Sequence, residues 1–119
     1  MMGPMRIGEL AEATGVSARS LRYYEDQGLL RAHRTPAGHR RFRPGDVERV
    51  VRIQQLYAAG LCSRVIAELL PCLDAPPRER TGHLQTRLAQ EHQRLDAAVR
   101  EAVRARDTLE EVITDLGRP

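Results

Sequence analysis

The stretch Val16–Leu30, VSARSLRYYEDQGLL, constrains the fold of this chain more than any other segment. Ser17 is a typical helix N-cap, and Gly28 is typical of the position just past a helix end, so a short helix is predicted between them. A first short helix over 6–13 precedes it, across a turn that contains Gly15. Two short helices joined by a tight turn with glycine form a helix-turn-helix, and this pattern favours DNA binding.

The second helix is amphipathic, with cationic and aromatic side chains on its outer side. At 3.6 residues per turn, Arg19, Arg22 and Tyr23 share that outer side, whereas Leu21 faces inward. Guanidinium and phenol groups on an exposed helix face suit contact with a phosphate backbone. We therefore expect this helix to be the recognition helix.

Positive charge is concentrated in the first half of the chain. Residues 1–60 contain ten arginines and six acidic residues, a net charge of +4, whereas residues 61–119 contain nine arginines and ten acidic residues, a net charge of −1. This asymmetry is expected of a protein whose N-terminal half contacts a polyanion. The chain has no lysine, which suits bidentate phosphate or guanine contacts and equally fits a GC-rich coding sequence.

A small β-hairpin is predicted directly after the recognition helix. Pro36 and Gly38 mark a turn between two short basic arms, Leu30–Arg34 and His39–Phe42. A hairpin in this place would be the wing of a winged helix-turn-helix.

Two further helices are expected, over 44–59 and 63–70. Pro44 favours the start of the first, while Pro71 and the Pro76-Pro77 pair are expected to end the second. The positions predicted to face the core in these two helices are Val47, Val50, Val51, Gln54, Tyr57, Val65, Ile66, Leu69 and Leu70.

The remainder predicts one long helix over 78–117, separated by a hinge at 74–77 from a DNA-binding domain at 1–73. Alternate steps of four and three residues from Leu84 give ten positions, of which only Glu91 is not apolar. A helix of roughly 58 Å with so narrow a seam favours a coiled-coil homodimer, with folding back on its own domain as the alternative. The predicted dimerisation residues are Leu84, Leu88, Leu95, Ala98, Ala102, Ala105, Leu109, Val112 and Leu116.

Three strings carry a family resemblance, which is continuous over about Arg6–Leu70: RIGELAEATGVS, RSLRYYEDQGLL and AGHRRFRPGDVERVVRIQQLYAAGL. They resemble the MerR family of bacterial transcription regulators, and the pairing of LRYYE…GLL with a G-[HY]-R-x-[FY] wing is highly specific. The resemblance implies a mainly α fold: a winged helix-turn-helix domain with a small β-hairpin wing, then a dimerisation helix in an antiparallel coiled coil. It also implies that the dimer binds a pseudo-palindrome in double-stranded promoter DNA and distorts the spacer, which affects RNA polymerase indirectly.

The resemblance further implies which residues contact DNA. Tyr24 is either such a contact or a core residue, because one tyrosine of an adjacent pair commonly faces the core. Arg49 and Arg52 are either phosphate contacts or solvated side chains. The residues that match the family's DNA-contacting positions are Ser17, Arg19, Arg22, Tyr23, Tyr24, His39, Arg40 and Arg41.

The two cysteines, Cys62 and Cys72, are typical of a reducing compartment, so the cytoplasm is expected. Cys62 stands where the family often has a capping Ser or Thr, and a thiol there is either redox-active or a small buried hydrophobe. Cys72 has the same two alternatives, a redox-active thiol or a small buried hydrophobe. Cys72 with His83 makes too thin a set for metal, and no metal or cofactor is expected. Because three residues follow Leu116, no large effector-binding domain is expected either.

Other classes of protein fit the sequence less well. An architectural, excisionase-like DNA-binding factor would leave the long apolar seam unexplained, and a coiled-coil adaptor would leave the LRYYE unit unexplained. A thiol- or metal-responsive version of the regulator stays open. No enzyme is expected, because no paired carboxylates, glycine-rich phosphate loop or Cys/His/Asp set share a credible site. No membrane partner is expected, since no run of about 18 apolar residues occurs.

Overall fold

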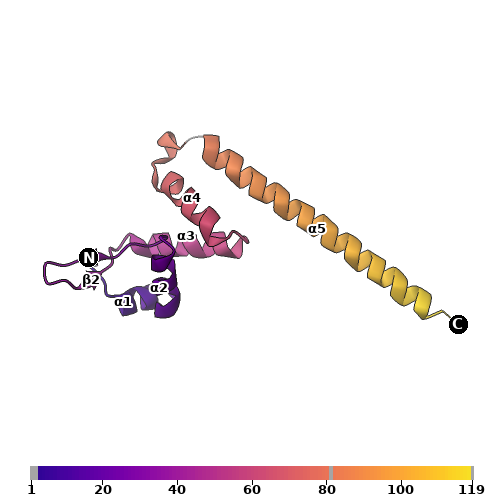
Figure 1. Ribbon diagram of the computed structural model, residues 1–119, viewed down its shortest axis with the longest axis horizontal. Coiled ribbons are helices and arrows are strands. Elements are labelled where there is room, and N and C mark those ends of the chain that lie inside the picture. Colours follow the sequence, from indigo (N-terminus) through magenta and orange to yellow (C-terminus); the bar gives the residue numbers. More distant parts are fainter. Residues whose placement is uncertain (1–2, 81, 119) are drawn as a thin grey trace. The chain divides into compact units, whose positions relative to one another are not determined.

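The structure is a computed structural model that describes residues 3–80 and 82–118, and it is mainly helical, as predicted. The chain divides into two units, Met1–Arg78 and Glu79–Pro119. The first unit is a winged helix-turn-helix and the second is dominated by one long helix (Figure 1). This confirms the predicted fold class. In the described part of the chain, no helix is long and apolar enough to cross a membrane.

The helix-turn-helix consists of α1 (Ile7–Thr14) and α2 (Ala18–Asp26). Gly15 ends α1 with a φ of 74°, a left-handed conformation that glycine adopts without a Cβ clash. Ser17 caps α2, because its hydroxyl accepts a hydrogen bond of 3.1 Å from the backbone N–H of Ser20. Both local signals in the sequence therefore mark the helix ends correctly.

A Schellman motif ends α2 and turns the chain into the core. The N–H of Gly28, at a φ of 75°, donates to the carbonyl of Glu25 at 3.0 Å. The N–H of Leu29 donates to the carbonyl of Tyr24 at 2.9 Å. This turn buries the side chains of Leu29 and Leu30 and leads directly into the wing.

The wing is a two-stranded antiparallel hairpin of β1 (His33–Arg34) and β2 (Arg40–Arg41), in which His33 lies opposite Arg41. The turn closes with a bond of 2.8 Å from the N–H of Gly38 to the carbonyl of Thr35. The predicted hairpin is therefore present, but only two residues of each predicted arm pair as strands.

The base of the wing is tied to the start of the chain. Met5 and Phe42 form an antiparallel bridge with two N–H···O=C bonds of 2.7 Å each. The ring of Phe42 is only 1% exposed, and it is among the largest fully buried side chains of the described residues. The core of the first unit contains Met5, Leu10, Val16, Leu21, Tyr24, Leu29, Leu30, Phe42, Val50, Ile53, Leu61, Val65, Ile66, Leu69 and Leu70.

Helix α3 (Asp46–Ala58) starts two residues later than predicted, with Gly45 as its N-cap residue. The carboxylate of Asp46 accepts a hydrogen bond of 2.8 Å from the backbone N–H of Arg43, which holds the loop against the first turn. Pro44 therefore lies in the approach to the helix.

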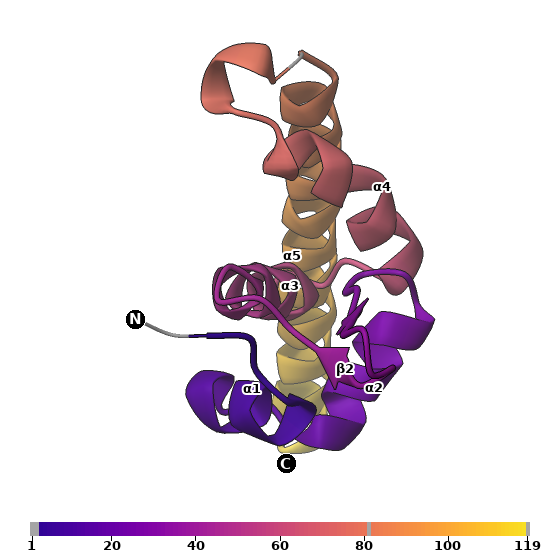
Figure 2. The ribbon, with the colours of Figure 1, turned by 90° about the vertical axis from the view of Figure 1, so that its left-hand side faces the viewer.

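The buried face of α3, which packs on α1 and α4 (Figure 2), differs from the predicted stripe. Val50 and Ile53 are fully buried, whereas Val51 is 47% exposed and Gln54 is exposed. The predictions for Val51 and Gln54 were wrong. Val51 lies about 100° around the helix from the buried Val50, and Gln54 lies about 100° from the buried Ile53. Tertiary contacts, which the sequence pattern does not contain, set this rotation of the helix.

Helix α4 (Ser63–Asp74) continues through Pro71, so the prediction that this proline ends the helix was wrong. A proline within a helix removes one backbone hydrogen bond, a cost that packing of the buried face offsets here. The helix ends where Ala75 is extended, at a ψ of 148°, immediately before Pro76. The predicted core residues of α4 are confirmed as Val65, Ile66, Leu69 and Leu70.

In the second unit, α5 (Gly82–Leu116) is a single helix of 35 residues, about 53 Å long at 1.5 Å per residue. A short 3-10 helix, η1 (Pro77–Glu79), occupies the residues before it. Glu91 is the polar member of the predicted seam, and it pairs with Arg87 and Arg94 at 3.0 Å each. The seam is therefore interrupted once, by a carboxylate with two guanidinium partners.

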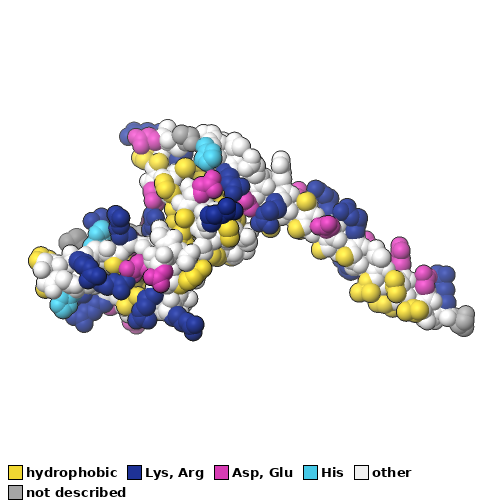
Figure 3. All heavy atoms as spheres, viewed as in Figure 1, with side chains coloured by type: hydrophobic (Ala, Val, Ile, Leu, Met, Phe, Trp, Pro, Cys, Tyr) yellow, Lys and Arg dark blue, Asp and Glu magenta, His cyan; other side chains and the backbone are white. Residues whose placement is uncertain are grey.

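Most residues of the predicted seam lie exposed on α5. Leu84 is buried and Leu95 is half-buried, while the other seven are exposed. Figure 3 shows hydrophobic side chains gathered toward the C-terminal end of the helix. The exposed apolar surface of α5 is wider than the predicted seam, because it also contains Val99, Val103 and Ile113.

Candidate nucleic-acid interface

A hollow between α1, α2 and the wing brings together the basic side chains predicted to contact DNA, except Arg19, which is not part of its lining. It encloses about 400 Å³ and is lined by Arg22 of α2, by Arg40 and Arg41 of β2, and by His39 of the turn. Arg6, which precedes α1, lies on the same wall. We call this the arginine hollow. Sequence reasoning did not find Arg6, because only the bridge of the chain start to the wing brings it here.

Helix α2, the predicted recognition helix, presents unpaired guanidinium groups to solvent. Arg19 and Arg22 are both exposed, and within residues 3–80 and 82–118 neither has an ion-pair partner. Ser17 is exposed at the N-terminal end of the same helix. These groups are available to anionic ligands without breaking any internal ion pair.

The wing arginines are partly engaged within the first unit. Arg40 donates to the carboxylate of Glu25, an ion pair whose two side chains are 43% and 24% exposed. Arg41 donates to the carbonyl of Arg40 at 2.8 Å, and Arg34 donates to the carbonyl of Gly38 at 3.1 Å. The ion pair links the wing to α2, although a pair this exposed contributes at most about 1 kcal/mol.

The adjacent tyrosines of α2 point in different directions. Tyr23 is 49% exposed, whereas Tyr24 is only 7% exposed. The ring of Tyr24 stacks on Tyr57 of α3, with the ring centroids 5.6 Å apart and the planes at 22°. Tyr24 is therefore a core residue, which is one of the two alternatives that the sequence left open.

A cluster of three hydroxyl groups connects α2, α3 and α4. The hydroxyl of Ser63, the first residue of α4, lies 2.5 Å from that of Tyr57 and 3.3 Å from that of Tyr23. Burial raises the pKa of Tyr57 above its ordinary value of 10.0, so its hydroxyl keeps its proton at neutral pH. Through the same cluster, Ser63 links the exposed Tyr23 to α4. The sequence alone did not predict this contact, because the two residues are 40 positions apart.

Arg49 is engaged in holding the first unit together. Its Nε donates to the carbonyl of Leu29 at 2.8 Å, and its Nη1 donates to both carboxylate oxygens of Asp74 at 2.7 and 2.6 Å. These bonds connect α3 with the end of α2 and the end of α4. Arg52 donates to Gln55 at 3.1 Å on the outer side of α3. Arg49 is thus a structural residue. The sequence analysis had predicted either a phosphate contact or a solvated side chain at this position.

The two cysteines belong to opposite ends of α4. Cys62 is the exposed N-cap residue, and Cys72 is half-buried in the last turn. The nearby backbone N–H of Val65, in the first turn of α4, lowers the pKa of the Cys62 thiol below its ordinary value of 9.0. Among the described residues, no three His, Cys, Asp or Glu side chains gather closely enough to hold a metal ion.

We expect Cys62 to react with iodoacetamide faster than Cys72 at neutral pH. The ordinary pKa of a cysteine thiol is 9.0, and a lowered pKa increases the fraction of thiolate at any pH below that value. The thiolate is the nucleophile in this reaction. Alkylation rates of the Cys62→Ser and Cys72→Ser chains, followed by mass spectrometry as a function of pH, check this. A Cys62 midpoint at or above 9.0, or faster reaction of Cys72, would contradict it.

Comparison with known proteins identifies the family. The chain matches the family described as MerR HTH family regulatory protein over residues 5–72. It is 38% identical to the nodulation protein NolA of Bradyrhizobium elkanii over 110 residues, which cover 92% of this chain and 47% of NolA. The chain spans about half the length of NolA in this and two further Bradyrhizobium strains.

Solved structures of the same family share the fold. The regulator PbrR691 from Ralstonia metallidurans CH34, solved in complex with lead(II), gives a TM-score of 0.73 at 26% identity, over 94% of this chain and 84% of that one. HiNmlR, a MerR family regulator lacking the sensor domain and bound to promoter DNA, gives 0.64 at 24% identity, over 94% and 89%. The sequence match over residues 5–72 and the winged helix-turn-helix together establish that this chain belongs to the MerR family of helix-turn-helix regulatory proteins.

Proposed function

We propose that this chain is a homodimeric, sequence-specific DNA-binding regulator of transcription. The observation that carries the proposal is the arginine hollow, where Arg22 of the recognition helix meets Arg40 and Arg41 of the wing. A second support is family membership, together with the fold shared with HiNmlR, which was solved on promoter DNA.

In the proposed complex, α2 enters the major groove and the wing contacts the flanking backbone. Arg19, Arg22 and Tyr23 face the groove, with Ser17 at the end of the helix nearest the phosphates. His39, Arg40 and Arg41 contact phosphate. Phosphate contacts of this kind position a protein, whereas contacts to base edges specify the sequence.

The dimer is proposed to form through α5, whose apolar residues are largely exposed within one chain. Two recognition helices related by a two-fold axis would read a pseudo-palindrome. In this proposal the dimer distorts the promoter spacer, and RNA polymerase responds to the altered DNA shape. The exposed leucines and valines of α5 support this, because large exposed apolar stripes mark interaction surfaces.

The salt dependence of binding tests the DNA-binding proposal. Fluorescence anisotropy of the reduced full chain on labelled duplex DNA should give a log–log salt slope of roughly −5 to −7, as expected for about six to eight phosphate contacts. Tighter binding to DNA from upstream of its gene than to random DNA would support sequence-specific recognition. A slope near zero would contradict an interface built from arginines.

Arg40→Ala should weaken binding to all DNA sequences alike and flatten the salt slope by about one unit, because one phosphate contact is lost. Glu25→Gln is the matched control, since it removes the ion pair with Arg40 but keeps the cation. We expect this control to leave the slope unchanged. An altered sequence preference with an unchanged slope in the Arg40→Ala chain would assign Arg40 to base recognition instead.

A thiol-responsive version of the same regulator is the second candidate. It is favoured by the position of Cys62, which is exposed, has a lowered pKa and directly precedes Ser63 of the hydroxyl cluster. Peroxide would convert its thiolate to sulfenic acid at the start of α4. DNA affinity measured before and after peroxide, in the unsubstituted and Cys62→Ser chains, tests this; equal affinities throughout would eliminate it.

A further inference from the structure

The hydroxyl cluster of Tyr57, Ser63 and Tyr23 runs from the core of the first unit to its surface. The ring of Tyr57 stacks on the buried Tyr24, and its hydroxyl lies 2.5 Å from that of Ser63. Ser63 is half-buried at the start of α4, and its hydroxyl lies 3.3 Å from that of Tyr23. Tyr23 is 49% exposed, so the outer end of the cluster reaches solvent while its inner end is fixed by packing.

The hydroxyl cluster has one proton more than its internal hydrogen bonds use. Each hydroxyl group carries one proton, so the contacts of Ser63 with Tyr57 and with Tyr23 use two of the three protons. The remaining proton needs an acceptor outside the cluster, and it has the best access to one on Tyr23, because Tyr57 and Ser63 are half-buried. This favours donation from Tyr57 to Ser63 and from Ser63 to Tyr23, which leaves the proton of Tyr23 directed outward.

The charged side chains near Tyr23 favour an anion as the acceptor. Arg19 and Arg22 are exposed on α2 within about one turn of Tyr23, and Arg64 is exposed in the first turn of α4. Asp26, also exposed, lies about one turn beyond Tyr23 on α2. Three guanidinium groups thus accompany one carboxylate, and the local balance of charge is positive.

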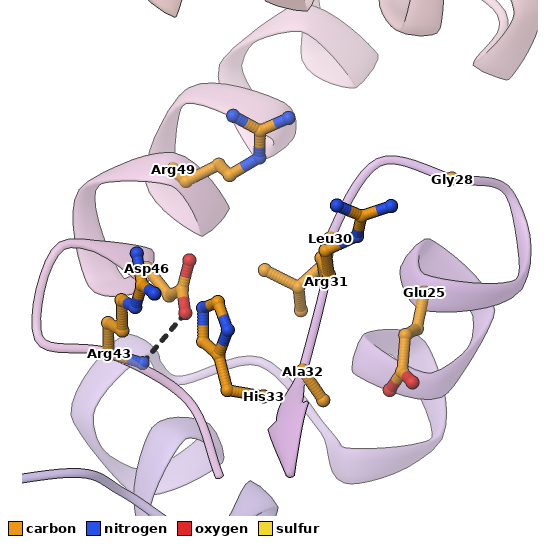
Figure 4. Close-up of a pocket in the computed structure, with 9 residues that line it drawn as sticks. All are labelled: Glu25, Gly28, Leu30, Arg31, Ala32, His33, Arg43, Asp46 and Arg49. Carbon is orange, nitrogen blue, oxygen red and sulfur yellow. Dashed lines mark hydrogen bonds between the residues drawn. The ribbon is translucent and has the colours of Figure 1, made fainter. Parts of the chain in front are cut away.

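Two further carboxylates, those of Glu25 and Asp46, belong to a separate hollow of about 740 Å³ between the end of α2, strand β1 and the start of α3 (Figure 4). Neither Tyr23 nor Ser63 lines that hollow. Glu25 lies on nearly the opposite side of α2 from Tyr23, and it is paired with Arg40. These carboxylates therefore do not compete for the outward proton of Tyr23.

We propose that Ser63 and Tyr57 are positioning residues, which direct the hydroxyl of Tyr23 toward a phosphate at the edge of the DNA groove. This inference rests on the proposed DNA-binding function. The O–H of Tyr23 donates to a phosphate oxygen, a hydrogen bond that the charge of the acceptor strengthens. The bond from Ser63 to Tyr23 becomes stronger at the same time, because consecutive hydrogen bonds polarise one another. The tie to α4 also restricts the exposed side chain before DNA binds, which lowers the entropy lost on binding.

Fluorescence anisotropy of the full chain tests this, on a duplex from upstream of its gene and on a random duplex. Ser63→Ala and Tyr57→Phe should each weaken binding about three- to tenfold, as expected when one hydrogen bond is lost. Ser63→Thr keeps a hydroxyl group and should bind within about twofold of the unsubstituted chain. Thr114→Ala, which removes a hydroxyl from an exposed residue of α5, is the matched control and should also stay within about twofold.

A double-mutant cycle with Tyr23→Phe separates positioning from a general effect on the fold. Ser63→Ala should cause no further loss in the Tyr23→Phe chain, because its effect depends on the hydroxyl of Tyr23. The salt slope should stay unchanged in all these chains, since no cation is removed. The loss should be equal on both duplexes, because a phosphate contact does not depend on the base sequence.

Three results would overturn the proposal while leaving the DNA-binding function intact. They are an unchanged affinity of the Ser63→Ala chain, an undiminished effect of Ser63→Ala in the Tyr23→Phe chain, and a loss confined to the upstream duplex, which would assign Tyr23 to a base edge. An unsubstituted chain that binds neither duplex would instead contradict the DNA-binding proposal, and this inference with it.

Discussion

The Leu109→Glu chain should be monomeric at concentrations where the unsubstituted chain is a dimer. Leu109 is 59% exposed on α5 and belongs to the predicted seam, so the proposed coiled coil would bury it. Each buried leucine contributes about 2 kcal/mol, and a carboxylate in its place adds a desolvation cost. A homodimer contains two such positions, so about 4 kcal/mol or more is lost, which is about a thousandfold in the dimer dissociation constant.

Sedimentation equilibrium over a range of chain concentrations measures this effect. Arg104→Glu is the matched control, because it introduces the same carboxylate about 140° around the helix from Leu109. The control should remain a dimer. The Leu109→Glu chain should also bind operator DNA far more weakly, since a monomer engages one half-site. A Leu109→Glu chain that stays dimeric would contradict pairing through this seam.

Phe42→Ala should lower the free energy of unfolding of the first unit by about 3–5 kcal/mol. Phe42 is 1% exposed, and its backbone pairs with Met5, so truncation leaves a cavity where the wing, the chain start and the core meet. Urea unfolding followed by tyrosine fluorescence isolates this unit, because the chain has no tryptophan and its tyrosines are at 23, 24 and 57.

Val51→Ala is the control for this prediction, since Val51 is 47% exposed on α3. A substitution on that surface should change the free energy of unfolding by no more than about 0.5 kcal/mol. If the two chains unfold at the same urea concentration, Phe42 does not hold the wing to the core in the way the packing implies.

Local signals in the sequence correctly predicted both ends of α2 and the turn of the wing. Ser17, Gly28 and the turn with Gly38 act through bonds to residues within five positions, so sequence spacing alone contains the necessary information. The rotation of α3, which buries Ile53 and exposes Val51, depends on packing against other helices and could not be predicted. The same holds for the passage of α4 through a proline.

The candidate interface was predicted in outline and refined by long-range contacts. Arg22 and the wing residues followed from the family resemblance, and the arginine hollow brings them together. The inward turn of Tyr24 depends on its stacking partner Tyr57, which lies 33 positions later in the chain. The link from Ser63 to Tyr23 and the pairing of Arg40 with Glu25 likewise join distant segments, and no local pattern marks them.

The most direct test of sequence-specific regulation is a footprint of the reduced chain on the DNA immediately upstream of its gene, with random competitor DNA present. We predict one protected pseudo-palindrome between the two promoter elements, with two half-sites related by a two-fold axis. Substitution of Arg22 by Ala should abolish this protection. Protection no stronger than on random DNA, or an unchanged footprint with Arg22→Ala, would contradict recognition through α2.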